Sequence, residues 1–271
     1  MSQNVVESSI STEVKAAYSA WVSMTKMRFD EFARKGALFL WAIRPVFDLA
    51  IAALIYAGGR KDLVPYIVVA MTANSLVWNS IFWVGEILDR ERRKGTLLSL
   101  FLAPCSRLSW MIGFAGSGII ETTAGAATVC IGGVILFGVR FHPNYLTLAV
   151  TLPLFMASLL GIGLIMSGLG LITKHANELS NLVFPFLTLL GGVYYPISQL
   201  PWFLHDLARC LPLGYGFQAL SDAALNSASI GDVRSELIPL LAFALVLPIA
   251  GTIIFMTLER SARRGGELDL Y

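Results

Sequence analysis

Six long apolar stretches limit what this chain can fold into more than any other feature of its sequence. A helix needs about 20 mostly apolar residues to cross roughly 30 Å of hydrocarbon, because each residue adds about 1.5 Å. Stretches near this length occupy residues 37–57, 63–88, 108–138, 144–173, 179–196 and 236–258. With 56% hydrophobic and 14% charged residues, the chain is also far more apolar than a soluble domain. We therefore expect an all-α integral membrane protein with six transmembrane helices.

The segments outside these six spans also show helical patterns. Residues 11–35 place aromatic and aliphatic residues at helical spacing beside Lys and Arg, which predicts an amphipathic helix in the membrane interface; packing on a partner is the alternative. Between the last two spans, residues 197–235 are broken by Pro and Gly into two short amphipathic pieces, 201–210 and 215–226. We expect these pieces to be outer half-helices buried in protein, because lipid cannot satisfy free peptide groups.

The distribution of Lys and Arg predicts the orientation. An even number of spans puts both termini on one side, and that side carries 14 of the 20 cationic residues, whereas the other carries five. The positive-inside rule then places both termini in the cytosol. We expect one transmembrane domain over 1–271, with a cytosolic tail and interface helix at 1–35, the six-helix membrane domain at 36–258 and a second cytosolic tail at 259–271. The net charge of +2 argues against nucleic-acid binding.

The sequence lacks the motifs of familiar enzymes. It has no G-x-x-x-x-G-K-[ST], H-E-x-x-H or G-x-S-x-G pattern, and its three His and three Cys residues are scattered without metal-ligand spacing. We therefore expect a transport subunit with no catalytic site, no metal and no cofactor of its own.

The densest polar segment follows the second span, where we expect residues 86–98 to extend that span as a rigid, charged cytosolic helix. Its candidate coupling residues are Glu86, Asp89, Glu91, Arg92, Arg93, Lys94, Gly95 and Thr96. This segment, with Gly-Thr-Leu after the charges and a later Ala-Pro, resembles the coupling region of type-2 permeases of ATP-binding-cassette exporters. A plain topology anchor is the alternative, although it would need only the cations.

A second segment is similar to the signature of the same family. Residues 191–202 read Gly-Gly-Val-Tyr-Tyr-Pro-Ile-Ser-Gln-Leu-Pro-Trp, and Leu-Pro-Leu-Gly-Tyr-Gly follows at 211–216. The family has Gly, two aromatic residues and Pro at the outer end of its fifth span, then Leu-Pro-Leu before the second half-helix. Leu98-Ser99 and Gly214-Tyr215-Gly216 depart from the usual pattern at single positions.

The resemblance implies partners and a location. It implies two ATP-binding-cassette ATPase subunits on the cytosolic face, which bind ATP and Mg, and a second copy of this chain or a close paralogue in the membrane. It also implies a multi-pass protein of the bacterial inner membrane, surrounded by lipid. Lys174, His175 and Glu178 are a plausible second contact with the ATPase.

Aromatic and polar residues of the second and fifth spans are candidates for a substrate path. In the second span Asn74 and Trp78 are four residues apart, and Asn79 and Trp83 repeat this spacing, so we expect one broad polar and aromatic face. Hydrogen bonding between helices is the alternative. The fifth span contributes the aromatic residues Phe184, Phe186, Tyr194 and Tyr195.

Three charged residues lie within the spans. Glu121 in the third span needs a partner or a role, because a charge at that depth costs roughly 2.5–3.5 kcal/mol. Arg44 and Asp48 in the first span are one turn apart and are a candidate pair. We favour export of a small amphipathic, drug-like or lipid-like compound, since few charges line the predicted path. Export of a lipid-linked polysaccharide or other glycan, and proton-coupled secondary transport through Glu121, are the alternatives.

Overall fold

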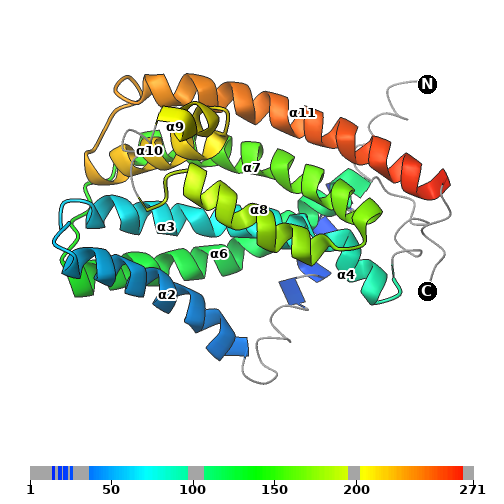
Figure 1. Ribbon diagram of the computed structural model, residues 1–271, viewed down its shortest axis with the longest axis horizontal. Helices are drawn as coiled ribbons and strands as arrows, with labels where there is room; N and C mark the ends of the chain where they lie inside the picture. The colour runs from blue at the N-terminus through cyan, green and yellow to red at the C-terminus, as the bar shows by residue number, and fades with distance from the viewer. Residues whose placement is uncertain are drawn as a thin grey trace.

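The computed structural model describes residues 37–96, 107–194 and 202–264, and parts of 14–26. Throughout these ranges the regular structure is helical. The helices outside the N-terminal region are α2 (Ala37–Ala57), α3 (Val64–Trp78), the π-helix η1 (Asn79–Val84), α4 (Ile87–Arg93), α6 (Arg107–Phe137), α7 (Tyr145–Thr173), α8 (Ala176–Leu190), α9 (Trp202–Arg209), α10 (Pro212–Leu225) and α11 (Arg234–Arg264). The longer helices form an elongated bundle with their axes roughly along its length, and the short helices α9 and α10 lie at one end of it (Figure 1).

The helices occupy the ranges that the hydropathy pattern predicts, but the count of six spans is not confirmed. Within the described residues, four helices are long and apolar enough to cross a membrane: Val64–Val84, Gly113–Phe137, Tyr145–Thr173 and Arg234–Ser261. The predicted fifth span is shorter than expected, because α8 has 15 residues and ends at Leu190, with Gly191 as its C-cap. At about 1.5 Å per residue such a helix covers only about 22 Å of a hydrocarbon layer of roughly 30 Å.

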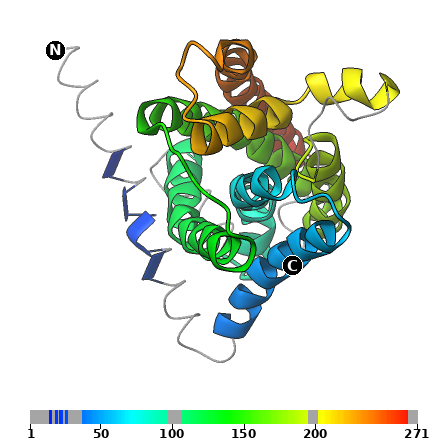
Figure 2. The same cartoon turned by 90° about the vertical axis from the view of Figure 1, so that its left-hand side faces the viewer.

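The α3 helix lies at the centre of the bundle. Viewed along the bundle, α2, α6, α7, α8 and α10 surround it, and α11 lies farther out against α7 and α10 (Figure 2). Apolar residues lie on all sides of α3, and Ile67, Val68, Ala70 and Val77 are completely buried. A helix that is apolar all round gains most from such a position. Polar side chains on α3 therefore have other helices, rather than water, as neighbours.

The helix that contains the predicted second span is interrupted rather than continuous. After α3, η1 replaces the α-helical pattern with wider turns, so that the Gly85 amide donates to the Ser80 carbonyl five residues earlier at 2.9 Å. Gly85 and Glu86 then form a turn, α4 is only seven residues long, and Gly95 adopts a φ of +72°. The prediction of one rigid extension over 86–98 is therefore wrong for its described part: α4 is a separate short helix, and residues 97–98 lie outside the described residues.

Glycines permit a close approach between α7 and α11. Gly161 of α7 faces the backbone of Leu247 and Pro248, and Gly251 of α11 faces the backbone of Gly161 in return. A side chain at either position would meet main-chain atoms that cannot rotate away. Small residues at the contact thus set how closely these two long helices pack.

Backbone hydrogen bonds tie the loops to α10 at the end of the bundle where α2 joins α3. His142 and Asn144 donate their amides to the Ala224 and Ala223 carbonyls of α10 at 2.9 and 2.8 Å. In addition, the side-chain hydroxyl of Thr147 in α7 donates to the Ala228 carbonyl, just after α10, at 2.9 Å. The two short helices α9 and α10 cover the predicted ranges 201–210 and 215–226 closely. Leu213, Phe217 and Ala219 bury α10 against the bundle, as expected for a half-helix that lipid alone could not accommodate.

The N-terminal segment is described only in part. The described positions within 14–26 are helical, and Val14 and Tyr18 are exposed. Trp21 lies against α6, since a methyl group added to Gly116 would meet the indole Cδ1 at 3.3 Å. An amphipathic helix in the membrane interface stays a prediction.

Candidate functional site

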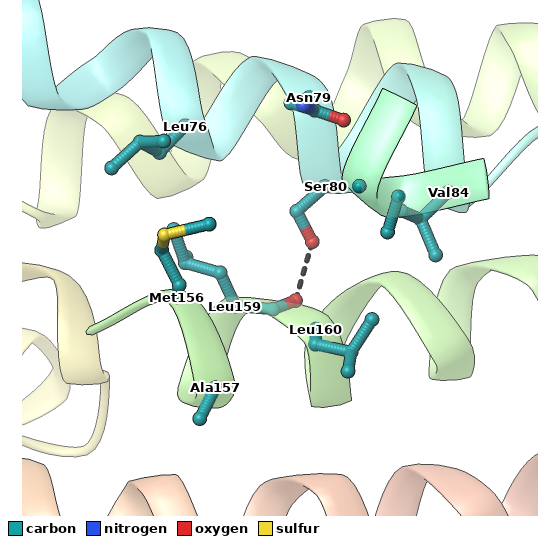
Figure 3. A pocket seen from close by; sticks show the side chains of 10 residues that line it. Leu76, Asn79, Ser80, Val84, Met156, Ala157, Leu159 and Leu160 are labelled. Carbon is teal, nitrogen blue, oxygen red and sulfur yellow. Dashed lines mark hydrogen bonds between the residues drawn. The ribbon is translucent and has the colours of Figure 1, made fainter. Parts of the chain in front are cut away.

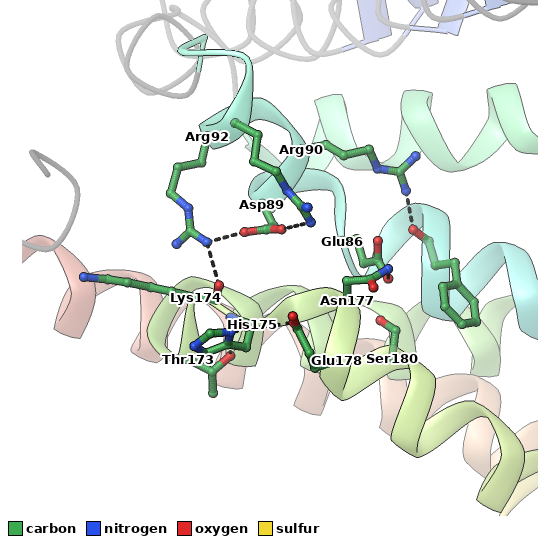
Figure 4. Close-up of polar contacts among 12 residues, drawn as sticks. Glu86, Asp89, Arg90, Arg92, Thr173, Lys174, His175, Asn177, Glu178 and Ser180 are labelled. Atoms are coloured by element: carbon green, nitrogen blue, oxygen red, sulfur yellow. Dashed lines mark hydrogen bonds and ion pairs between the residues drawn. The ribbon is translucent and has the colours of Figure 1, made fainter. Parts of the chain in front are cut away.

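The two segments predicted to contact an ATPase come together at one end of the bundle. Residues 86–96 and 174–178 lie side by side there, and we call them the charged end (Figure 4). Arg92 donates to the Lys174 carbonyl at 3.2 Å, and the Asn177 amide donates to the Glu86 carboxylate at 3.4 Å. The α4 helix is therefore joined directly to the turn between α7 and α8.

Asp89 is the anchor of the charged end. Its side chain is 4% exposed, and its two carboxylate oxygens accept hydrogen bonds from Arg92 and Arg93, one from each. These partners are three and four residues later, so all three side chains share one face of α4. A buried carboxylate is stable only with such partners, and Asp89 therefore holds both arginines in position.

Arg90 points the opposite way, toward η1. It donates to the carbonyl oxygens of Phe82 and Trp83, and its guanidinium carbon lies 4.1 Å from the centroid of the Trp83 ring. The candidate coupling residues predicted from the sequence do not include Arg90. Its spacing of seven residues from Trp83, about two helical turns, is the signal that could have identified it.

Glu91 and Thr96 close the charged end after α4. Glu91 is buried and accepts a hydrogen bond from the Thr96 hydroxyl, and Lys94 Nζ lies 3.9 Å from its carboxylate. Gly95 permits this tight return because its φ of +72° strains other residues. The acidic candidates Glu86, Asp89 and Glu91 are therefore all directed into the protein.

The charges that face outward at this end are mostly cationic. Arg93, Lys94 and Lys174 are exposed, and so are His175 and Glu178, whose side chains lie 3.7 Å apart. Lys174 ends α7 in the left-handed region, with a φ of 58°. Exposed cations held on two adjoining turns form a surface that can meet an acidic partner.

Asn74 and Trp78 face α8 and α2. Thr188 of α8 donates to the Asn74 side-chain carbonyl at 3.3 Å, and Arg44 of α2 donates to the Asn74 main-chain carbonyl at 3.4 Å. Trp78 stacks on Phe82 with ring centroids 3.9 Å apart, and Phe184 of α8 meets both rings edge-on. Arg44 lies over Trp78 at 4.3 Å from the ring centroid.

Asn79 and Trp83 face a different helix. Asn79 donates to the Thr122 hydroxyl of α6 at 3.3 Å, and Trp83 lies 6.2 Å from the Phe114 ring of α6. The expectation of one broad face shared by both pairs is therefore not met, because the pairs turn toward α8 and α6 respectively. Each asparagine makes a hydrogen bond to another helix, as the alternative predicts, and a role in a substrate path stays a prediction.

The remaining candidates, for the substrate path and for charges within the membrane, do not form one cluster among the described residues. Phe186 is exposed and Tyr194 is half-buried, whereas Tyr195 lies outside the described residues. Asp48 is within electrostatic range of Arg44. Glu121 belongs to α6, but its side chain lies outside what the structure describes, so its role stays a prediction.

A family model and two relatives match the sequence of this chain. The model of the ABC-2 type transporter family matches residues 19–225. The chain is 26% identical over 167 residues to the linearmycin resistance permease protein LnrN of Bacillus subtilis, covering 62% of this chain and 43% of that protein. It is 29% identical over 153 residues to the probable multidrug ABC transporter permease YbhR of Escherichia coli K12, covering 56% of this chain and 41% of that protein. The matches thus span less than half the length of either relative.

Proposed function

Because the chain belongs to the ABC-2 type transporter family, we propose that it is the transmembrane subunit of an ATP-driven exporter whose ATPase is a separate chain. The charged end is the observation that carries this proposal. Its exposed cations lie on helical turns whose buried acidic side chains already have partners within the protein. The charged end can therefore keep its shape while its exposed charges bind a partner.

The contacts of the charged end supply a route from an ATPase into the membrane. Arg90 connects α4 to the carbonyls of η1, and Arg92 connects α4 to the turn between α7 and α8. A displacement of α4 would therefore act on the central helix and on two others at once. A simple topology anchor requires none of these contacts.

The proposed assembly follows from the resemblance described above. It contains two copies of this chain, or one copy and a close paralogue, with two ATPase subunits that bind ATP and Mg. The charged end and both termini lie in the cytosol of a bacterial cell, and the helices cross the inner membrane. The cationic excess on that side supports this orientation.

The proposed substrate is a small amphipathic, drug-like or lipid-like compound. The relatives named for linearmycin resistance and for multidrug transport support this class over a glycan. The cluster of Trp78, Phe82 and Phe184 supports it too, because stacked rings offer an apolar surface without fixed hydrogen-bond geometry.

Charge reversal at the outward-facing cations tests the docking proposal. The full chain is tagged and co-purified with the proposed ATP-binding-cassette ATPase, and Lys94→Glu/Lys174→Glu is compared with Arg60→Glu/Arg140→Glu. The control pair makes the same change of charge at exposed positions of the opposite end. We expect the first variant to retain about a tenth or less of the ATPase and the control to retain all of it.

Equal ATPase retention by the two variants would refute docking at the charged end. Reversal at Glu91 and Arg92 is a poorer test, because Glu91 is a buried partner of Thr96 and Arg92 joins α4 to the Lys174 carbonyl. Lys94 is more exposed, and its own ion pair with Glu91 is long, at 3.9 Å. The purified chain alone should show no ATP hydrolysis. Transport driven by a proton gradient without any ATPase would favour the secondary carrier instead.

A further inference from the structure

Two cavities of the chain have opposite linings. One, of about 250 Å³, lies between α3 with η1, α6 and α7 (Figure 3). Its walls are mainly apolar, formed by residues such as Leu76, Met156 and Leu160, and none of its lining residues carries a formal charge. Apolar cavities in proteins can stay empty, so this one calls for no ligand. The other, of about 780 Å³, has a polar and charged lining, and we call it the polar cavity.

The polar cavity lies at the end of the bundle where α2 joins α3, opposite the charged end (Figure 1). Under the proposed orientation this is the outer side. A volume of about 780 Å³ is within the range of roughly 300–1,000 Å³ that is usual for ligand pockets. The charged residues of the lining come from separate elements: Asp62 before α3, Arg140 before α7, Arg209 of α9, Asp222 of α10 and Glu236 of α11.

A row of polar side chains on α10 forms one wall of the polar cavity. Gln218, Asp222 and Asn226 are four residues apart, so they share one face of the helix. The side-chain amides of Gln218 and Asn226 each donate to one carboxylate oxygen of Asp222, both at 3.0 Å. Because the amide nitrogens are used in this way, the amide oxygens stay as acceptors. The row therefore holds a carboxylate in position and has further acceptors on either side of it.

Ser221 adds an unpaired hydroxyl to the same wall. The residue is 3% exposed, and its hydroxyl makes no hydrogen bond within the part of the chain that the structure describes. Ser167 also has an unpaired hydroxyl among the described residues, but that oxygen is fully enclosed, whereas Ser221 keeps accessible surface and belongs to the cavity lining. Buried hydroxyl groups in proteins are usually paired, so an unpaired one that faces a cavity points to a ligand.

The charges of the lining favour a cationic ligand. The lining has three carboxylates and two arginines. Asp222 and Glu236 are half-buried, and neither makes an ion pair with a cation of the described chain, whereas Arg140 and Arg209 are exposed to water. A metal ion is not indicated, because the described His, Cys, Asp and Glu side chains form no group of three that could hold one. An organic ammonium group is therefore the cation that fits.

We propose that the polar cavity binds a water-soluble, polyhydroxylated amine, whose ammonium group is held by the carboxylates of Asp222 and Glu236 and one of whose hydroxyls pairs with Ser221. A neutral polyol would leave the two carboxylates without a counter-charge. An apolar cation would leave the Ser221 hydroxyl and the amide oxygens of the row unpaired, which costs free energy. The inference goes beyond the proposed function, because it gives the chain a ligand at the end opposite the proposed ATPase contact.

Glucosamine and glucose are matched probes of this site, because they differ only by an ammonium group in place of one hydroxyl. Each is titrated by saturation-transfer NMR into the full chain in a polyoxyethylene detergent, which carries neither sugar nor amine, at a slightly acidic pH that keeps the amine protonated. We expect glucosamine to bind at least about five times more tightly than glucose, because hydrogen bonds to charged groups are the stronger ones. Equal affinities, or no binding of glucosamine, would overturn the proposal.

Removal of single carboxylates locates the ammonium group. Asp222→Asn and Glu236→Gln each keep the side-chain shape, and Asp232→Asn makes the same change at an exposed residue outside the lining. We expect each lining variant to weaken glucosamine binding about fivefold or more and to change glucose binding by less than about twofold, and the control to change neither. Glucosamine binding that is unaffected by both lining variants overturns the proposal. Glu236 accepts a hydrogen bond only from its neighbour Ser235 among the described residues, so Glu236→Gln keeps the test valid even if Asp222→Asn fails to fold.

Ser221→Ala tests the hydroxyl of the site. We expect it to weaken glucosamine and glucose alike by about threefold, because a hydroxyl of either sugar can pair with Ser221. Unchanged affinity for both sugars would contradict the polyhydroxylated ligand. None of these results bears on ATPase binding, which tests the proposed function separately.

Discussion

The charged end and the region beside η1 differ in whether their buried polar groups have hydrogen-bond partners. At the charged end, Glu86, Asp89 and Glu91 are buried and each accepts a hydrogen bond from a neighbour. Beside η1, Asn79 is equally buried but leaves Oδ1 unpaired among the described residues. A fully paired network specifies a shape, whereas an unpaired acceptor retains the capacity to bind. The first region is held in one arrangement by paired groups, whereas the second keeps one acceptor without a partner among the described residues.

Both regions depend on close helix packing, and breaking it should have the largest effect. Gly161→Ala places a methyl group 2.6 Å from the Pro248 nitrogen, in main chain that cannot move aside. We expect a loss of about 3 kcal/mol, the upper part of the range for overpacked cores. The measurement is the unfolding midpoint of the full chain in detergent.

Gly125→Ala is the control for this change. Nothing lies within 4 Å of a methyl group at Gly125, so the variant should match or exceed the unaltered chain, because Ala favours helix by up to about 1 kcal/mol. Equal losses in the two variants would show that helix approach at Gly161 is not what limits stability.

Removing the anchor of the charged end should have the next largest effect. Asp89→Ala leaves Arg92 and Arg93 without their shared carboxylate, and we expect a loss of about 2 kcal/mol, because hydrogen bonds to charged groups contribute about 1.5–3 kcal/mol. Arg92 keeps its bond to the Lys174 carbonyl, which limits the loss.

The matched control is Asp62→Ala at the opposite end. Asp62 is 68% exposed and 3.6 Å from Arg60, so its removal should cost under about 1 kcal/mol. The same unfolding assay compares the two variants. If Asp89→Ala behaves like Asp62→Ala, the paired network does not hold the charged end together.

The sequence was sufficient for the positions of the helices and insufficient for the interruption within one of them. Apolar stretches and Pro and Gly residues gave α2, α6, α7, α9, α10 and α11 to within a few residues. They did not reveal η1, because a π-helical turn arises from contacts with neighbouring helices. Ser80 bonds to α7 and Asn79 to α6, and neither contact has a signal in local periodicity.

The candidate site was predictable in its residues but not in their directions. The motif at 86–96 and the Lys174 turn were identified from charge and from family resemblance, and the structure places them together. Periodicity did not show that the acids turn inward and the cations outward. The four-residue spacing predicts one face for both asparagines, because it assumes an uninterrupted α-helix through residue 83.

The smallest expected effect is also the sharpest test of the comparison, because it sets the two asparagines of the central helix against each other. Asn74→Leu removes the acceptor of the Thr188 hydroxyl, and we expect a loss of about 0.6–1 kcal/mol, typical of hydrogen bonds between membrane helices. Asn79→Leu has the same shape change and likewise removes one bond between helices, to Thr122, but it also removes the unpaired Oδ1. Removing that unpaired acceptor should offset the lost hydrogen bond. The free energy of unfolding should therefore change by less than about 0.5 kcal/mol. The two variants are compared by unfolding in the same detergent. A loss for Asn79→Leu equal to or larger than that for Asn74→Leu would mean that Oδ1 is satisfied in the folded protein, and the contrast between the two regions would disappear.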